Sequence, residues 1–265
     1  GAYEHRTNIS GRDEIAQIGE EFNSLTDRLQ TTETLRRRFV SDASHELKTP
    51  LAGIRLLTDS ILQTDHMDEE TTKEFVTDIG REAERLSRIT ENLLRLTRLD
   101  GGVVQAAYPV AIEPVMRRVE RMLGVVAGEK GVAISGSASE DAVALATEDD
   151  VHQILYNLME NAIKYSAAEN GFVRAEASVQ DGQVVITVTD NGIGIPDEDL
   201  PHIFDRFYRV DKMRSREVGG TGLGLSIVKD TIEGRGGAIS AGHGPDGVGT
   251  TFTVRLPLAQ REEEA

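Results

Sequence analysis

Two amides and an ammonium group share one face of a predicted helix in this 265-residue chain. Asn157, Asn161 and Lys164 stand at positions i, i+4 and i+7, which a helix places one above the other. So many polar groups on one face indicate a polar ligand. An amide oxygen is a hard ligand suited to Mg²⁺, and this ion commonly bridges a protein to phosphate oxygens.

A carboxylate and two glycines follow the next predicted strand. Asp190 ends that strand, and Gly192 and Gly194 come directly after it. A carboxylate at a strand end could accept a hydrogen bond from an exocyclic amine, and glycines allow the backbone to approach a ligand closely.

A third group opens a predicted helix, with glycines at 220, 222 and 224 in the segment 219–225. Free backbone amides at the positive end of a helix could cradle phosphates. The spacing is not a Rossmann fingerprint, and no Walker-type Gly-Lys-Ser/Thr occurs. One glycine-rich run could equally be a set of turns. The order of amide helix, strand-end Asp and glycine-opened helix is more specific.

A histidine near the start of the chain could act as a nucleophile. At about 100° per residue, His45 lies about 200° from Ala43 and from Leu47, which belong to an apolar stripe, so it points away from the core. A neutral imidazole can attack phosphorus when a carboxylate such as Glu46 accepts from its other nitrogen. Thr49 falls on the same face one turn later. Taken alone, His45 could equally be a solvated surface side chain.

Two long helices must position this histidine. Residues 33–100 carry apolar side chains at spacings of three and four in two runs of about 30 residues each, joined by a polar turn at 63–68. Two such helices have only one another to cover a wide apolar stripe, which favours dimerisation into a four-helix bundle. The alternative is a monomeric helical hairpin.

The remainder of the chain has a different pattern after Gly101-Gly102. Predicted helices at about 112–128, 148–165 and 222–233 mix with strands at 182–189 and 250–256. Neighbouring strand runs suggest hairpins, so we expect an α+β sandwich with a mixed sheet rather than a Rossmann repeat.

Charge and composition exclude several classes of protein. The net charge of −16 disfavours binding to nucleic acid and a broad basic membrane surface. It does not disfavour ATP, because Mg²⁺ and local amides can hold a triphosphate. Without cysteine the chain forms no disulfide or thiolate metal site. It has no continuous apolar stretch long enough for a transmembrane helix.

These motifs together resemble the cytoplasmic portion of a bacterial two-component sensor histidine kinase. The segment 45–50 resembles its H box, 157–165 the N box and 190–194 the G1 box; 203–209 is similar to the F box and 220–225 to the G2 box, and 249–252 looks like the last glycine element. The resemblance implies a dimerisation and histidine phosphotransfer hairpin at 33–101. It implies an ATP-binding catalytic domain of the GHKL (Bergerat) type at 102–265.

The resemblance also implies roles for the hairpin residues. His45 would be the phosphoacceptor and Glu46 its orienter or base. A homodimer would pass the phosphoryl group to an aspartate on the receiver domain of a response regulator. Thr49 completes a Glu-x-x-Thr pattern that implies phosphatase activity toward that regulator; alternatively, its hydroxyl bonds a carbonyl one turn back.

In the second domain the resemblance implies sites for ATP and Mg²⁺. Asn161 would hold the metal, and Asp190 would read the adenine amine. A lid would run from about Asp197 to Gly220. The remaining nucleotide contacts implied by the resemblance are Asn157 and Lys164 near the phosphates, Tyr165 beside the nucleotide, Gly192 and Gly194 shaping the pocket, Gly220, Gly222, Leu223 and Gly224 at the phosphate end of the lid, Thr250 near the base, and Arg209 toward a phosphate.

Residues 1–32 resemble the end of a HAMP signal-relay module, although Ala16 stands where that family usually has glycine. This implies a soluble fragment from the cytoplasmic side of a sensor in the inner (cell) membrane, anchored only through an upstream segment. Two other classes remain open. A chaperone, mismatch-repair or topoisomerase ATPase would share the nucleotide boxes but lack the histidine hairpin. A non-catalytic dimerising scaffold would have lost activity, whereas all the catalytic boxes are intact in this sequence. Stimulus, cognate regulator and phosphorylation within or between protomers are not fixed by these motifs.

Overall fold

The computed structural model describes residues 5–8, 14–64, 67–100, 105–167, 169–210 and 220–259. The chain divides into two compact units, Gly1–Ser87 and Arg88–Ala265. Several predicted features lie wholly or partly outside the described residues. They are the start of the HAMP-like pattern at 12–13, the centre of the turn at 65–66, the glycine pair at 101–102, and the lid at 211–219.

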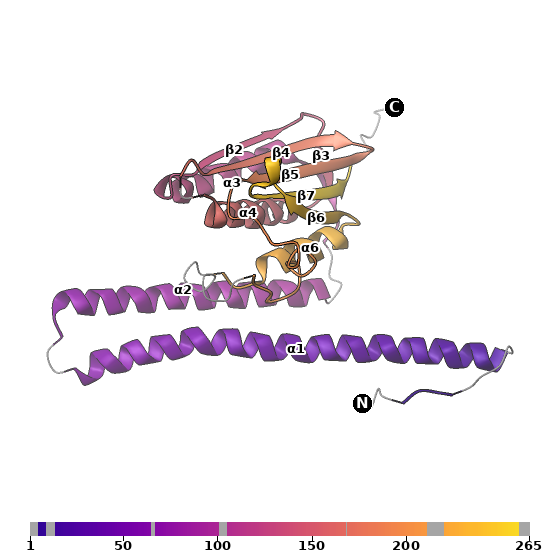
Figure 1. Ribbon diagram of the computed structural model, residues 1–265, viewed down its shortest axis with the longest axis horizontal. Helices are drawn as coiled ribbons and strands as arrows, with labels where there is room; N and C mark the ends of the chain where they lie inside the picture. Colours follow the sequence, from indigo (N-terminus) through magenta and orange to yellow (C-terminus); the bar gives the residue numbers. More distant parts are fainter. Residues whose placement is uncertain are drawn as a thin grey trace. The chain divides into compact units, whose positions relative to one another are not determined.

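The first unit is built on helix α1 (Glu14–Gln63) and the beginning of helix α2 (Glu69–Asp100) (Figure 1). The predicted bounds of α2 match the structure, but the length expected for the preceding helix was too short. α1 runs for 50 residues because neither glycine nor proline separates the HAMP-like block from the hairpin. Pro50 lies buried inside it, one turn after His45.

The two helices run antiparallel within this unit (Figure 1). Their register follows from two contacts: a Cβ on Gly53 would lie 3.8 Å from Glu82 Cγ, and Glu46 pairs with Arg85. Asp68 caps α2, since its carboxylate accepts from the backbone N–H and the hydroxyl of Thr71 at 2.8 and 2.7 Å. These hydrogen bonds lower the pKa of Asp68.

Apolar side chains remain uncovered along α1. Five of them recur every 11 residues, which is close to three turns and therefore places them on one stripe. They are between 44% and 77% exposed. We call this set the α1 stripe: Ile18, Leu29, Val40, Leu51 and Leu62.

The second unit contains the mixed sheet that the sequence predicts. The five-stranded sheet has the order β2-β4-β5-β7-β6, in which β2 and β4 are parallel and the other neighbours antiparallel. A second sheet pairs β1 with β3. The elements are β1 (Tyr108–Ala111), α3 (Ile112–Glu129), β2 (Ala133–Ala138), β3 (Val143–Ala146), α4 (Glu148–Tyr165), β4 (Phe172–Gln180), β5 (Gln183–Asp190), α6 (Gly224–Gly234), β6 (Ala238–His243), a 3₁₀ turn (Pro245–Gly247) and β7 (Thr250–Pro257).

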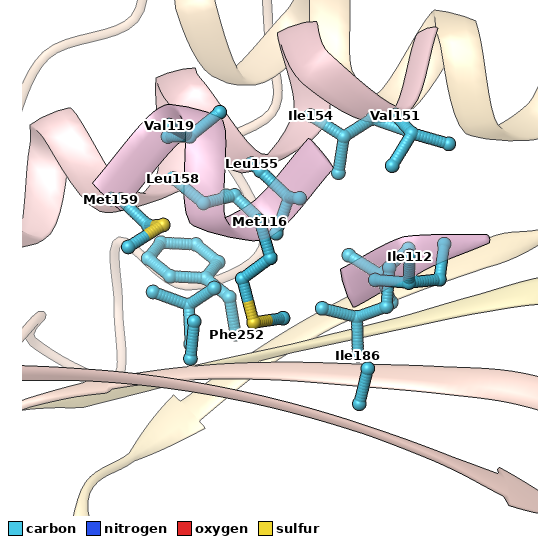
Figure 2. Packing of buried hydrophobic residues seen from close by; sticks show 14 of the residues in the cluster. Ile112, Met116, Val119, Val151, Ile154, Leu155, Leu158, Met159, Ile186 and Phe252 are labelled. Atoms are coloured by element: carbon cyan, nitrogen blue, oxygen red, sulfur yellow. The ribbon is translucent and has the colours of Figure 1, made fainter. Parts of the chain in front are cut away.

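Helices α3, α4 and α6 cover one face of this sheet (Figure 1). Residues of β7 alternate between buried and half-buried, as expected for a sheet with one covered face. Figure 2 shows Met116 and Leu155 reaching from the helices toward Ile186 and Phe252 of the sheet. This continuous core fixes α4, the end of β5 and the start of α6, which carry the predicted nucleotide residues.

No helix among the residues the structure describes is long and apolar enough to cross a membrane.

Candidate functional site

The polar face of helix α4 is oriented toward a cavity, because a capping box fixes the start of the helix and its apolar face is buried against the sheet. A capping box begins it: Thr147 Oγ1 accepts from Asp150 N at 3.2 Å, and the Asp150 carboxylate accepts from Thr147 N at 3.3 Å. Leu155, Leu158 and their neighbours are fully buried against the sheet. The predicted face of amides and ammonium is therefore held toward the cavity.

Two of these polar side chains are closely constrained. The Nδ2 of Asn157 is buried and has no hydrogen-bond partner among the described residues. Its Oδ1 would lie 3.2 Å from a Cβ on Gly224, so a side chain there would press on the amide. Lys164 donates to Glu160 at 2.9 Å, one turn back on the same helix. A buried amide lacking a partner is a polar group prepared for a ligand.

Asp190 lies where β5 ends and is only 4% exposed. Its Oδ1 accepts from the backbone N–H of Gly192 at 2.8 Å and of Thr250 at 3.3 Å. Its other oxygen accepts no hydrogen bond from the described residues. Burial raises the pKa of Asp190, and the two backbone donors offset part of this effect. A buried acceptor with one oxygen to spare suits an amine donor.

The glycines beside these residues are required by close backbone contacts. A Cβ on Gly192 would lie 2.0 Å from the carbonyl oxygen of Tyr165. Gly222 has φ +70°, and a Cβ there would lie 2.8 Å from the carbonyl carbon of Phe207. Both glycines allow two segments of backbone to meet at the wall of the cavity.

These residues enclose a cavity of about 760 Å³ within the second unit. Most of the predicted nucleotide residues line it. Gly192 and Leu223 do not; they support the residues that do. The predicted lining residues are Asn157, Asn161, Lys164, Tyr165, Asp190, Gly194, Arg209, Gly220, Gly222, Gly224 and Thr250.

The F box fastens the segment before residue 211 to the core. Arg206 donates to Asp230 of α6 at 2.9 Å, and the backbone N–H of Phe207 donates to the carbonyl of Gly222 at 2.8 Å. Ile203 belongs to the core, and Phe204 meets Phe252 edge-on at 6.4 Å between ring centroids. The apolar F-box residues Ile203 and Phe204 therefore pack against the core.

Sequence analysis did not single out one part of the cavity wall. His152 and Tyr156 line it from α4 and stack with ring centroids 6.0 Å apart. Burial lowers the pKa of His152 and raises that of Tyr156. Residues from the end of α2, including Arg88 and Asn92, also line it. Their helical spacing resembles that of any solvated face, so the sequence carries no signal for them.

His45 is exposed on α1, as its helical position predicts. Its ring forms no hydrogen bond or ion pair with a described residue. The Thr49 hydroxyl donates to the carbonyl of His45 at 3.2 Å. The hydroxyls of Ser44 and Thr58 make the same bond one turn back, so this contact is general on α1. Glu46 is half-buried and lies 3.5 Å from Arg85.

Comparison with known proteins identifies both parts of this arrangement. A model described as the His Kinase A (phospho-acceptor) domain matches residues 35–102, and one described as histidine kinase-, DNA gyrase B-, and HSP90-like ATPase matches residues 146–260. The signal transduction histidine-protein kinase AfsQ2 of Streptomyces coelicolor is 35% identical over 97% of this chain and 50% of its own length. The chain belongs to the two-component sensor histidine kinases.

Solved structures of histidine kinases share its fold. The crystal structure of full-length ShkA in complex with AMPPNP has a TM-score of 0.62 and 31% identity, covering 86% of this chain and 46% of ShkA. The structure of the Acinetobacter baumannii histidine kinase AdeS has a TM-score of 0.65 at 22% identity, covering 82% of this chain and 98% of AdeS. This histidine kinase chain thus combines a phosphoacceptor hairpin with an ATP-binding domain. It spans about half the length of the curated relatives it matches.

Proposed function

We propose that this chain is an ATP-dependent protein-histidine kinase that phosphorylates its own His45. The observation that carries the proposal is the combination of an exposed histidine on the hairpin with a cavity whose wall holds the buried Asp190 carboxylate. The hairpin sets the chain apart from chaperone and topoisomerase ATPases that share the nucleotide boxes.

Each end of ATP has matching groups in the cavity. The unused oxygen of Asp190 accepts from the adenine amine, and Thr250 lies beside it. The backbone amides where α6 begins, at Gly224, face the phosphates with the positive end of the helix. Lys164 and the buried Nδ2 of Asn157 add donors from α4.

The amide oxygen of Asn161 fits Mg²⁺, because it lines the cavity on the same face as Asn157 and Lys164. When bound, the ion supplies neutralisation of phosphate charge. The chain's own contribution is to position the triphosphate and to keep its polar groups oriented.

At the hairpin, a ring nitrogen of His45 forms the new bond to the γ-phosphorus while the bond to the β,γ-bridging oxygen breaks, and ADP leaves. Glu46 accepts from the other ring nitrogen and offsets the positive charge that develops on the imidazole. The phosphoryl group then passes to an aspartate carboxylate on the receiver domain of a response regulator.

A second copy of the chain covers the α1 stripe. Five apolar side chains along one helix are costly to leave in water, and an antiparallel hairpin gains a full core only as a four-helix bundle. We further infer that residues 1–32 end a HAMP module and that a segment of the parent protein anchors it in the membrane. The chain then acts on the cytoplasmic side.

Incubation with γ-labelled ATP and Mg²⁺ tests the proposal. The native chain and the matched control His5→Gln, an exposed histidine in the same unit, should both acquire acid-labile, base-stable label. His45→Gln should acquire none. ATP hydrolysis without label on the native protein would indicate a different ATPase of this fold, and absence of ATP binding would indicate a scaffold.

A further inference from the structure

One buried cation in the hairpin has no role in the reaction proposed above. Arg85 lies on α2 and is 8% exposed, although arginine is rarely buried unless it is paired. Its Nη2 lies 3.5 Å from Glu46 Oε2 on α1, and its Nη1 lies 3.7 Å from Glu82 Oε2 on its own helix. Its Nε has no hydrogen-bond partner among the described residues.

The two carboxylates beside Arg85 differ in what they touch. Glu82 is one turn back on α2 and packs near Gly53. Glu46 reaches Arg85 from the opposite helix, and it directly follows the exposed His45. The Arg85 guanidinium on α2 therefore contacts the carboxylate next to the proposed phosphoacceptor.

We propose that Arg85 is a positioning residue that holds the Glu46 carboxylate beside the His45 imidazole. The inference rests on the proposed function of His45 and deepens it. A half-buried carboxylate without its cation would turn toward water, because burial of an unpaired charge is costly. The ion pair holds the Glu46 carboxylate against α2, next to the turn of α1 that carries His45. In the reacting state this carboxylate would accept from the imidazole N–H. That N–H must be held for the opposite ring nitrogen to attack phosphorus.

The kinetic test compares Arg85→Gln with Glu82→Gln in the full chain. Arg85→Gln removes both carboxylate–guanidinium contacts, whereas Glu82→Gln removes only the contact that does not involve Glu46. Loss of a hydrogen bond to a charged group predicts a decrease of about 10- to 100-fold in kcat for Arg85→Gln. KM for ATP should be unchanged in both variants, and Glu82→Gln should keep kcat within about twofold of native. Arg85→Lys, which keeps the charge but not the planar fork, should restore part of the rate.

A double-mutant cycle distinguishes positioning from a structural effect. If Arg85 acts through Glu46, the variant E46Q/R85Q will be no slower than E46Q alone. Equal decreases for R85Q and E82Q, or effects that multiply in the double variant, would overturn the proposal. A kcat for R85Q within about twofold of native would do the same.

A measurement without ATP keeps the inference separate from the kinase activity. The ¹⁵N chemical shifts of the His45 ring at pH 8.5 report which nitrogen carries the proton. We expect R85Q to move these shifts toward those of E46Q, and R85K to move them less. If R85Q does not fold, the ¹⁵N shifts of the His45 ring in R85K serve as the test. Shifts identical to those of the native chain in the folded variant would overturn the positioning role. Absence of label on the native chain would refute the kinase proposal and leave this result standing.

Discussion

Asp190 is 4% exposed and accepts hydrogen bonds from backbone amides of its own unit. His45, by contrast, is exposed on a helix whose apolar stripe is also exposed in a single chain. The nucleotide cavity is enclosed by residues from α2, α4, β5, α6 and β7, all within Arg88–Ala265. The α1 stripe, by contrast, exposes apolar side chains along the full length of α1.

We therefore expect substitutions to impair nucleotide binding and dimerisation independently of each other. Nucleotide binding should depend on close contacts inside one chain. The hairpin should depend on a second copy, and reaction at His45 on both. Four predictions test this separation.

The largest effect should come from Gly192→Ala. Its Cβ would lie 2.0 Å from the carbonyl oxygen of Tyr165, so the backbone beside Asp190 must shift. We expect the affinity for ADP to decrease by at least about 100-fold, or about 2.8 kcal/mol. Calorimetry measures the affinity, and light scattering should give the same dimer mass as native.

The matched control is Gly124→Ala in α3, where a Cβ would meet nothing within 4 Å. It should leave binding unchanged and stabilise the helix by about 0.5–1 kcal/mol. If Gly192→Ala bound ADP normally, the close contact would not govern the cavity.

The second prediction concerns the other region. Leu51→Lys places a charge in the α1 stripe, and a symmetric dimer would bury it twice. We expect the dimer dissociation constant to rise by about 100-fold or more, measured by analytical ultracentrifugation, while ADP affinity stays within about twofold. Thr31→Lys, at an exposed position of the same helix about 200° around its axis from Leu29 of the stripe, tests whether any exposed lysine has this effect. A stable dimer of Leu51→Lys would refute the role of the stripe.

Asp190→Asn should have a smaller effect on ADP binding, and it should change binding and stability in opposite directions. The amide keeps an oxygen for the Gly192 and Thr250 amides but can present N–H₂ to the adenine amine, so ADP affinity should decrease by about 10- to 150-fold.

Stability should change in the opposite direction. Because the pKa of Asp190 is raised in the folded state, stability is lost as pH rises through that pKa, and the ionised group still destabilises the fold at neutral pH. The variant should therefore melt at a higher temperature than native at pH 7.5. This gain should narrow as the pH is lowered toward the usual value of 3.8. An unchanged ADP affinity would contradict the adenine assignment.

The smallest change in overall activity is expected for Thr49→Ala. Its hydroxyl donates to the His45 carbonyl at 3.2 Å. Ser44 and Thr58 make the same type of bond elsewhere on α1, so we expect the helix to remain folded without this one. The hydroxyl oxygen keeps lone pairs that can orient a water above His45. Autophosphorylation and phosphotransfer should persist, and decay of a phospho-regulator with ADP should slow by about tenfold. Ser44→Ala is the control; equal decay in native and Thr49→Ala proteins would reject the phosphatase role.

Local patterns predicted the helices α4 and α6 closely, because helical periodicity and the position of glycines can be read within one short segment. Helix α4 has the bounds expected from its periodicity. Helix α6 begins two residues later than predicted, since Gly222 has φ +70° and cannot be helical. The length of α1 was underestimated, because the HAMP-like block and the hairpin were read as separate segments although one helix runs through both.

Local sequence patterns could not predict the contacts between elements that are distant in the chain. The pairing of Arg85 with Glu46 depends on the register of two antiparallel helices, which a polar turn does not fix. The same holds for Arg235 and Asp150, joined at 2.7 Å although 85 residues apart. Burial of a charge, which marks these residues in the structure, cannot be read from a sequence in which charged side chains are usually solvated.

The unbroken course of α1 has a mechanical consequence. From Glu14 to His45 the helix extends about 46 Å without a proline, so rotation about its axis at one end is transmitted to the other. Val40 of the stripe and His45 are five residues apart, which fixes an angle of about 140° between them. Any turn that reseats the stripe against a second copy must swing the imidazole through the same arc. One rotation angle of α1 about its axis thus determines both which side chains contact the second chain and the direction in which His45 faces.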